Sequence, residues 1–315
     1  MRALCLMLAI LLALGGASAA QAICTTSSPS VIFTPGSSYD VQAGGIPSTS
    51  SSAGLSCSSP TLSVLGTSYA RATMTSANGF LLSNGADTIP YLVSPFSDFS
   101  QPFNQNATFD YLNVTFLALL GVLNGNNFTP MINLKLNGAP NISAGTYTDT
   151  LTISWSWKVC NSVQAGILCV GYETATGSST IQVKLVVGQD CRISAPDVSF
   201  GSAPLVSQFA TVSQAVLVDC TKNSAYKVSF TSGNGGSARP WRTMSDGAGH
   251  SLQYNIYQPD GTTIWDESNP THSATPGGGS TAPSQPQAYK VKINSGQITP
   301  PAGHYQDLVS VVISF

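Results

Sequence analysis

The sequence predicts an all-β protein of two tandem immunoglobulin-like β-sandwiches, the second of which is incomplete and lacks its last strand. Three observations support this prediction. Apolar and polar residues alternate along several segments, which is the pattern of strands with one buried face, and little of the chain shows helical spacing. One motif occurs twice, which indicates two related domains. The first copy is followed by a further apolar strand, and the second copy is not.

Residues 1–22 are expected to form a cleaved export signal. Arg2 gives a basic start, an apolar run follows, and Ala17-Ser-Ala19 and Ala20-Gln-Ala22 are two small-residue patterns at which a signal peptidase could cut. The apolar run is shorter than the roughly 20 residues that a membrane helix needs. We therefore expect an exported protein without a membrane span.

The charge balance argues against a nucleic acid or an anionic lipid surface as partner. The chain has 12 Lys and Arg against 14 Asp and Glu, and only 8% of its residues are charged. Proteins that bind phosphate groups electrostatically carry a basic surface, which this composition does not supply.

The repeated motif is Ala144-Gly-Thr-Tyr-Thr-Asp149, which returns as Ala302-Gly-His-Tyr-Gln-Asp307. Each copy leads into a strand whose apolar residues share one face, beginning at the tyrosine of the motif. A short polar segment separates the two halves. We therefore predict an N-terminal domain at 23–187, a linker at 188–190 and a C-terminal domain at 191–315.

The cysteines are expected to form disulfides. Of the seven, Cys5 leaves with the signal, and an even number in an exported chain favours disulfides over metal ligands. Six cysteines permit 15 pairings, and the repeat selects one cysteine pair within each half. The remaining two lie close together and are expected to staple a hairpin. The predicted bridges are Cys24–Cys57, Cys160–Cys169 and Cys191–Cys220.

The two halves differ in the segment after the repeated strand. In the first half, Thr180-Ile-Gln-Val-Lys-Leu-Val-Val187 alternates and predicts one more strand, enough to close a sandwich. The second half stops at Phe315. A missing last strand leaves an apolar groove and unpaired backbone groups, which favour accepting a strand from another chain. The alternative is a domain that ends on an ordinary edge strand. The predicted groove residues are Val309, Val311, Ile313 and Phe315.

A set of residues spread over the second half carries a family resemblance. They are Cys191-x-Ile-Ser-Ala195, Phe200-Gly201, Val218-x-Cys220, Tyr226, Val228, Arg242-x-Met244, Leu252-x-Tyr254-x-Ile-Tyr257, Trp265 and Pro301-Ala-Gly303-x-Tyr305-x-Asp307. In these positions the chain resembles the spore coat protein U family, whose members include pilins of archaic chaperone-usher pili. Asp266 replaces the glycine that usually follows the tryptophan, for which we expect only a local loop change. The first half matches more loosely, with Thr34 after Phe33 where the family has glycine.

The resemblance implies an assembly route and a set of partners. Such pilins are incomplete sandwiches that a periplasmic chaperone holds, an outer-membrane usher assembles, and the N-terminal strand of the next pilin completes. Cys24 follows the predicted signal so closely that we expect no strand to donate. A chain that accepts a strand without donating one belongs at the pilus tip, on the cell surface. The resemblance thus implies a tip adhesin that mediates surface attachment and biofilm formation.

Three segments of the first half combine glycine with aliphatic residues and are candidate adhesive loops. They are 43–47, 117–123 and 165–168. Burying aliphatic side chains yields about 25 cal/mol per Å² with little chemical selectivity, which suits attachment to abiotic or host surfaces. Hydrophobic finger-like loops are also what the resemblance implies. For 117–123 the alternative is a buried strand or short helix. The candidate residues are Ile46, Leu119, Leu120, Val122, Leu123, Ile167 and Leu168.

Two other roles stay open beside the tip adhesin. One is a sugar-binding tip lectin that uses the aromatic residues Tyr91, Phe96 and Tyr111. The other is a secreted coat or matrix protein that polymerises by strand exchange. An adhesin of the expected kind would need no cofactor.

No catalytic or metal site is predicted. The histidines, His250, His272 and His304, lack the spacing of metal ligands. Ser224-x-x-Lys227 falls on a strand pattern, whereas a nucleophilic serine of that motif opens a helix. The repeat equivalents Asp149 and Asp307 are expected to make a hydrogen bond shared by both domains, and Tyr147 and Tyr305 to anchor a tyrosine corner.

Overall fold

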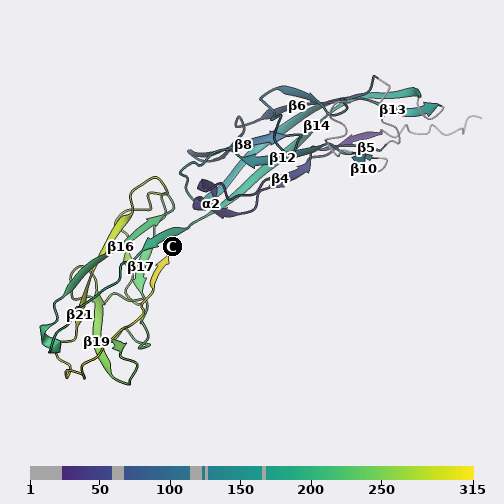
Figure 1. Cartoon of the computed structure of the whole chain (residues 1–315). Coiled ribbons are helices and arrows are strands. Elements are labelled where there is room, and N and C mark those ends of the chain that lie inside the picture. The colour runs from purple at the N-terminus through teal and green to yellow at the C-terminus, as the bar shows by residue number, and fades with distance from the viewer. Residues whose placement is uncertain (1–22, 59–66, 114–122, 125–126, 165–167) are drawn as a thin grey trace, which may run out of the picture.

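The computed structural model describes residues 23–58, 67–113, 123–124, 127–164 and 168–315. They form two elongated β-rich bodies arranged end to end (Figure 1). Each body has its own hydrophobic core, one formed by residues between Cys24 and Val187, the other by residues between Val206 and Ile293. We refer to residues 23–187 as the N-terminal body and to residues 191–315 as the C-terminal body.

The N-terminal body is built from a four-stranded sheet and a ten-stranded sheet. The four-stranded sheet has the order β1-β5-β11-β10, and the larger sheet follows the path β2-β14-β13-β7-β8-β12-β4, with β3, β6 and β9 paired beside it. The elements are β1 (Cys24–Thr26), β2 (Ser30–Ile32), β3 (Gly36–Ser37), α2 (Ser38–Gln42), β4 (Thr49–Ser52), β5 (Leu55–Ser58), β6 (Tyr69–Ser76), β7 (Leu81–Asn84), β8 (Asp87–Ser94), β9 (Ala107–Asp110), β10 (Leu123–Asn124), β11 (Asn127–Phe128), β12 (Met131–Leu136), β13 (Gly145–Gln164) and β14 (Leu168–Gly188).

The C-terminal body contains a five-stranded sheet, β15-β16-β21-β19-β18, and a three-stranded sheet, β20-β17-β22. Its elements are β15 (Cys191–Ser194), η1 (Val206–Gln208), β16 (Val212–Cys220), β17 (Lys227–Phe230), β18 (Arg242–Ser245), β19 (Ser251–Tyr257), β20 (Thr271–His272), β21 (Gln285–Ile293) and β22 (Val311–Ser314). The predicted all-β class is confirmed. The tandem immunoglobulin-like arrangement and the domain boundaries stay predictions.

The long hairpin of β13 and β14 organises the N-terminal body. Both strands alternate as predicted, so that one face of each enters the core. Strand β14 pairs antiparallel with β13 on one side and parallel with β2 and β3 on the other. It therefore lies between β13 and the short strands β2 and β3. The core residues of the two strands, all at most 4% exposed, are Tyr147, Leu151, Ile153, Trp155, Trp157, Ile181, Val183, Leu185 and Val187.

Three disulfides are present, and they are the three predicted pairs. Cys24 and Cys57 lie opposite each other on β1 and β5, and Cys191 and Cys220 do so on β15 and β16. The third joins β13 to β14 near the tip of their hairpin. By loop-closure entropy each of the two long-range bridges contributes about 3–4 kcal/mol to stability.

The repeated motif makes the same hydrogen bonds in both bodies. The hydroxyl of Tyr147 donates to the carbonyl oxygen four residues before it, at 2.8 Å, and Tyr305 does the same at 2.7 Å. The carboxylates of Asp149 and Asp307 each accept from a tyrosine hydroxyl at 2.6 Å, Tyr91 in the first body and Tyr254 in the second. Burial, and then the neighbouring carboxylate, raises the pKa of both of these tyrosines. The aspartates are therefore structural.

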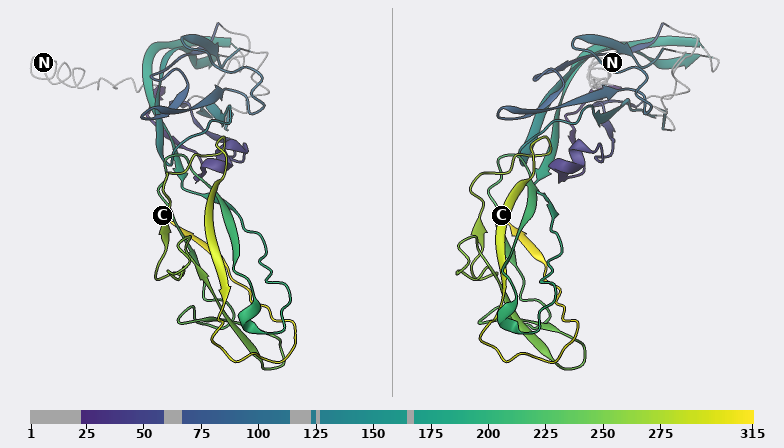
Figure 2. Two further views of the ribbon diagram at one scale, coloured as in Figure 1. Left: turned by 90° about the vertical axis from the view of Figure 1, so that its left-hand side faces the viewer. Right: turned by 60° about the vertical axis from the view of Figure 1, so that its left-hand side comes forward.

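The two bodies meet close to α2 (Figures 1 and 2), and polar side chains join them there. The hydroxyl of Tyr39 donates to the carbonyl oxygen of Asp219 at 2.8 Å, and the Arg192 guanidinium lies 4.2 Å from the centre of the Tyr39 ring. Lys222 forms an ion pair with Asp87. Arg192, Asp219 and Lys222 lie within two residues of Cys191 or Cys220 in the chain. The Cys191–Cys220 disulfide therefore holds together the residues of the C-terminal body that contact the N-terminal body.

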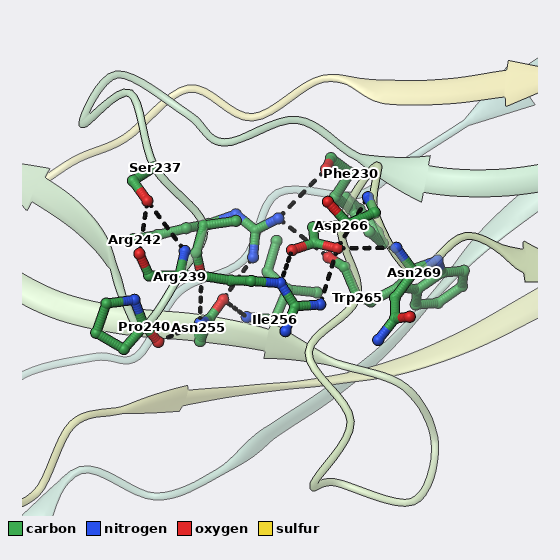
Figure 3. Close-up of polar contacts among 12 residues, drawn as sticks. Phe230, Ser237, Arg239, Pro240, Arg242, Asn255, Ile256, Trp265, Asp266 and Asn269 are labelled. Carbon is green, nitrogen blue, oxygen red and sulfur yellow. Dashed lines mark hydrogen bonds and ion pairs between the residues drawn. The ribbon is translucent and has the colours of Figure 1, made fainter.

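A buried arginine organises the C-terminal body (Figure 3). Arg242 is 0% exposed, and its guanidinium donates to the carbonyl oxygens of Thr231, Phe230 and Trp265 and to the side chain of Asn255. Desolvation lowers its pKa. These four acceptors lie on three separate chain segments, so the arginine holds them together.

Asp266 has a role that the sequence did not suggest. It is 5% exposed, and its two oxygens accept from Nε and Nη2 of Arg239 at 2.7 and 3.1 Å. It also accepts from the backbone N–H groups of Ser268 and Asn269, at 3.1 and 3.0 Å. The residue that replaces the family's glycine therefore binds an arginine and the following turn.

We expect Arg242→Leu to lower the stability of the C-terminal body by more than about 3 kcal/mol, because it leaves four buried acceptors without a donor. Arg71 provides the surface control: it lies on β6, which pairs with β13 as β17 pairs with β22, and its exposed side chain contacts Asp110 at 3.4 Å and the Tyr69 ring at 4.5 Å. Arg71→Leu should therefore change stability by less than about 1 kcal/mol. Calorimetric unfolding of both variants measures the difference, and equal losses would show that the buried network is dispensable.

Candidate strand-accepting groove

The last strand of the C-terminal body has a paired side and an open side. Strand β22, which follows the second copy of the repeated motif as β13 follows the first, pairs with β17. Among the described residues no strand lies on its other side. In the N-terminal body β14 occupies that position. Segment 195–205, which corresponds to the region of β2 and β3, likewise forms no strand. The C-terminal body thus has two facing edges with no strand between them.

Side chains along these edges are less covered than their equivalents in the N-terminal body. Tyr147, Leu151 and Ile153 are 0% exposed. The corresponding Tyr305 and Val309 are only partly buried, as are Val311 and Ile313 of β22. The difference arises because β14 covers the first set, and within the described chain no strand covers the second.

The opposite wall of the groove was missed by the sequence reasoning. Val31 and Phe33 in the N-terminal body are 2% and 0% exposed and contact the same core as β14. Val198 and Phe200 stand at the same spacing from the first cysteine of their half, yet are only partly buried. The repeated Phe was recognised in the sequence as a family position. Its place beside the missing strand depends on the three-dimensional pairing.

The predicted groove residues lie together on one edge. Val309, Val311 and Ile313 pack against the core with part of each side chain uncovered. Phe315 is 54% exposed and lies near the junction, where the chain's C-terminus is marked (Figure 2). The groove therefore runs along β22 from the junction toward the distal end of the C-terminal body.

Most candidate adhesive residues lie outside the described residues or carry no description of their side chains. Leu119, Leu120, Val122 and Ile167 lie outside the described residues. Leu123 belongs to β10, opposite Phe128, and Leu168 opens β14, opposite Gln164. Strand β10 and the start of β14 lie toward the end of the N-terminal body that is remote from the junction (Figure 1). The backbone thus brings Leu123 and Leu168 to the same end.

Ile46 does not belong to this end, and its prediction as an adhesive residue is wrong. Its side chain is 9% exposed and belongs to the core. It packs on Gly36, where an added Cβ would lie only 2.4 Å from its Cδ1 atom, close to α2 and the junction. An aliphatic residue in a glycine-rich loop was buried because the loop folds back onto the short strand β3.

The aromatic residues of the lectin alternative are also buried. Tyr91, Phe96 and Tyr111 are 2%, 8% and 0% exposed. The hydroxyls of Tyr91 and Tyr111 donate to Asp149 and to the carbonyl oxygen of Met131. Side chains used in this way cannot stack on a sugar ring, so the prediction of these residues as a sugar site is wrong.

The histidines and acidic residues form no site of another kind in the described part of the chain. No group of three or more His, Cys, Asp or Glu there could hold a metal ion. His250 pairs with Asp246, with 2.7 Å between Nδ1 and the carboxylate. No described helix is long and apolar enough to span a membrane.

Solved structures resemble the chain in fold. A chain of the crystal structure of the CsuC-CsuE chaperone-tip adhesion subunit pre-assembly complex from Acinetobacter baumannii superposes with a TM-score of 0.60 at 20% identity, covering 93% of this chain and 100% of that one. The CupB6 tip adhesin of Pseudomonas aeruginosa gives a TM-score of 0.34 at 11% identity, with 93% and 94% covered. Of these two, the first shows a shared fold.

No curated protein matches the chain in sequence. The model of one family does match, described as the Spore Coat Protein U domain, and it does so over two separate stretches, residues 11–154 and 177–312. Each match contains one copy of the repeated motif, and the second match begins within β14. The chain therefore belongs to the spore coat protein U domain family.

Proposed function

We propose that this protein is the adhesive tip subunit of a chaperone-usher pilus and mediates surface attachment and biofilm formation. The observation that carries the proposal is the difference between the two bodies at one strand position. The N-terminal body fills that position with its own β14, and the C-terminal body leaves an apolar groove beside β22. A strand from a neighbouring pilin fills this groove in the pilus.

The pairing of β13 with β14 supports a specific form of incoming strand. Strand β14 runs antiparallel to β13 and places Leu185 opposite Tyr147 and Ile181 opposite Leu151. Tyr305 and Val309 occupy the equivalent positions in the C-terminal body. The donor strand therefore runs antiparallel to β22 and presents an apolar residue at every second position.

A groove of this kind is unstable in water, so the subunit needs partners before assembly. A periplasmic chaperone covers the groove during export, and an outer-membrane usher exchanges it for the next pilin. The shared fold with a chain of a chaperone-tip subunit complex supports the chaperone step. The self-completed N-terminal body then projects beyond the last pilin, at the cell surface.

The end remote from the junction is where the N-terminal body meets a surface. Strand β10 and the start of β14, which carry Leu123 and Leu168, lie toward that end (Figure 1), and the outward positions of β13 and β14 carry Ser and Thr. Attachment therefore rests on the aliphatic tips, and the strands contribute solubility. The proposed adhesive residues are Leu119, Leu120, Val122, Leu123, Ile167 and Leu168.

Fusing the N-terminal strand of a neighbouring pilin to the C-terminus should raise the thermal midpoint of the C-terminal body and the yield of soluble protein, because the strand covers the groove. In the fused protein, Ile313→Asp should remove most of this gain. Asp in place of the 58% exposed Ile32 serves as the matched control and should leave the gain intact. An unfused protein that is already as stable as the fused one would sink the strand-accepting proposal.

Replacing Leu120 and Ile167 together by serine should lower attachment to polystyrene at least several-fold without changing the thermal midpoint, because less apolar surface is buried on contact. Ile32→Ser is the control, since Ile32 is exposed on β2. Binding measured with free sugars present separates the two adhesive mechanisms. Competition by a sugar would favour a lectin and contradict hydrophobic attachment.

A further inference from the structure

Glu173 accepts hydrogen bonds from the backbone at the start of the N-terminal body. The backbone N–H of Ile23 donates to Oε2 of Glu173 at 2.7 Å, and that of Cys24 donates to Oε1 at 3.3 Å. The indole N–H of Trp157 also donates to Oε1, at 3.1 Å. Burial alone would raise the pKa of Glu173, but the three N–H donors outweigh it and the pKa is lowered. A carboxylate that stays ionised and lies beside the nitrogen of Ile23 is suited to bind a positively charged group there.

We infer that the export signal is cut between Ala22 and Ile23 and that the freed α-ammonium group of Ile23 forms an ion pair with Glu173. Hydrolysis adds water across the Ala22–Ile23 peptide bond, so the leader leaves with a carboxylate and Ile23 keeps a protonated amine. The nitrogen already lies within hydrogen-bond distance of the carboxylate. Of the two cut positions the sequence allows, only this one leaves the free amine on the residue whose nitrogen contacts Glu173.

Other contacts hold Ile23 in place for this pairing. Its carbonyl oxygen accepts from the backbone N–H of Ser58 at 2.8 Å, and the next residue forms the Cys24–Cys57 disulfide. The titratable residues next to Trp157 and Glu173 in the chain are Lys158 and Tyr172. The Lys158 ammonium donates to Thr67 and lies over the Tyr172 ring, so it is directed to other groups.

The ion pair fixes the new N-terminus to the N-terminal body. A tethered N-terminus cannot extend into the groove of another subunit, so the chain accepts a strand and donates none. This consequence for assembly rests on the proposed function, whereas the cut position and the ion pair do not.

Intact-mass measurement of the exported protein should give a chain that begins at Ile23. A neighbouring carboxylate raises the pKa of the amine above its ordinary value of about 7.7–8.0. The stability it adds is therefore present below that pH and is lost as pH rises through the raised value. The thermal midpoint of the native protein should fall more steeply between pH 8 and 10 than that of Glu173→Gln.

Glu267→Gln is the matched control, because Glu267 is exposed, and this variant should keep the native pH dependence. A mature chain that begins at Ala20 would overturn the inference. So would a chain that begins at Ile23 but shows the same pH dependence in all three proteins.

A second observation concerns the distal end of the C-terminal body. In the N-terminal body the junction is formed by α2 and segment 140–143, where Asn141 donates to Gly278 and Thr281 across it at 3.0 and 2.9 Å. In the C-terminal body, spacing from the first cysteine makes Leu205 and η1 the equivalent of α2. Spacing from the repeated motif makes segment 298–301 the equivalent of segment 140–143. These lie at the far end of the C-terminal body, where Figure 2 shows η1.

This distal surface is apolar and uncovered. Leu205 is 50% exposed and Ile298 is 93% exposed, whereas Ser38, the equivalent of Leu205, is 6% exposed at the junction. The backbone N–H of Val206 donates to the Thr299 hydroxyl at 3.4 Å, so the two exposed residues belong to adjoining segments. Exposed aliphatic residues of this size mark a contact surface.

We propose that this surface, Leu205 with Ile298, docks the body of the same pilin whose strand fills the groove. Strand β14 ends its pairing with β13 and passes through 188–190 directly into the C-terminal body. A donor strand in the equivalent position would lead its own body to the equivalent surface. This proposal rests on the proposed function. Because the surface is apolar, the pilin must meet it with apolar residues, where the internal junction uses polar ones.

Photo-crosslinking in assembled pili tests the docking surface. Benzoylphenylalanine is placed at Leu205, at Ile298, at the groove residue Phe315, and at Leu217 as a control that is 43% exposed on β16. The first three positions should yield a covalent product with one and the same pilin, identified by mass spectrometry. Position 217 should yield no such product.

The outcomes separate the two proposals. A product at Phe315 with none at Leu205 or Ile298 would overturn the docking surface and leave strand acceptance standing. A protein that enters pili without any product at Phe315 would overturn strand acceptance, and the docking surface with it.

Discussion

The structure depends on one requirement of a β-sandwich, that its apolar face be covered and its edges paired. In the N-terminal body β14 covers the apolar face with four buried side chains, Ile181, Val183, Leu185 and Val187. At about 1.5–3 kcal/mol for each fully buried aliphatic side chain, the four together contribute about 6–12 kcal/mol. The whole net stability of a domain is about 5–15 kcal/mol. A body that lacks this strand is therefore near the limit of folding, which gives the C-terminal body a strong tendency to take up a strand.

The two bodies answer this requirement differently although they share the repeated motif. The N-terminal body builds long strands, and continuous hydrogen-bond ladders join β13 to β14 and to β6. The C-terminal body has shorter strands, and Arg242 enters the interior to bind backbone carbonyls of segments that have no continuous ladder between them. A buried cation without a direct carboxylate partner is costly. It is retained here because its removal would leave those carbonyls unpaired.

Period-2 alternation predicted the strands well because each residue's face depends only on its neighbours along the chain. Two of the disulfides and the two tyrosine corners followed from the repeat for a similar reason, since equivalent residues of homologous halves keep equivalent partners. The failures concern which end or side of the body a segment reaches. Ile46 and Tyr91 have the local patterns of exposed loops and binding aromatics, but a fold-back onto β3 and a hydrogen bond to a residue far along the chain bury them. Alternation also does not show whether the second edge of a strand is paired. For this reason Val198 and Phe200 were not predicted to line the groove.

The two ends of the molecule differ in whether they can pair with another strand. Its first residue on the described structure is held by Glu173, and the groove beside β22 opens from the junction toward the opposite end of the molecule. The N-terminal body is thus closed along its core, and the C-terminal body is open. A polymer of strand-exchanging units grows only if each unit both accepts and donates, so a unit closed at one end terminates the polymer there. Under the proposed function, the two open edges of the C-terminal body and the tethered start of the N-terminal body both favour a position at the tip of the fibre.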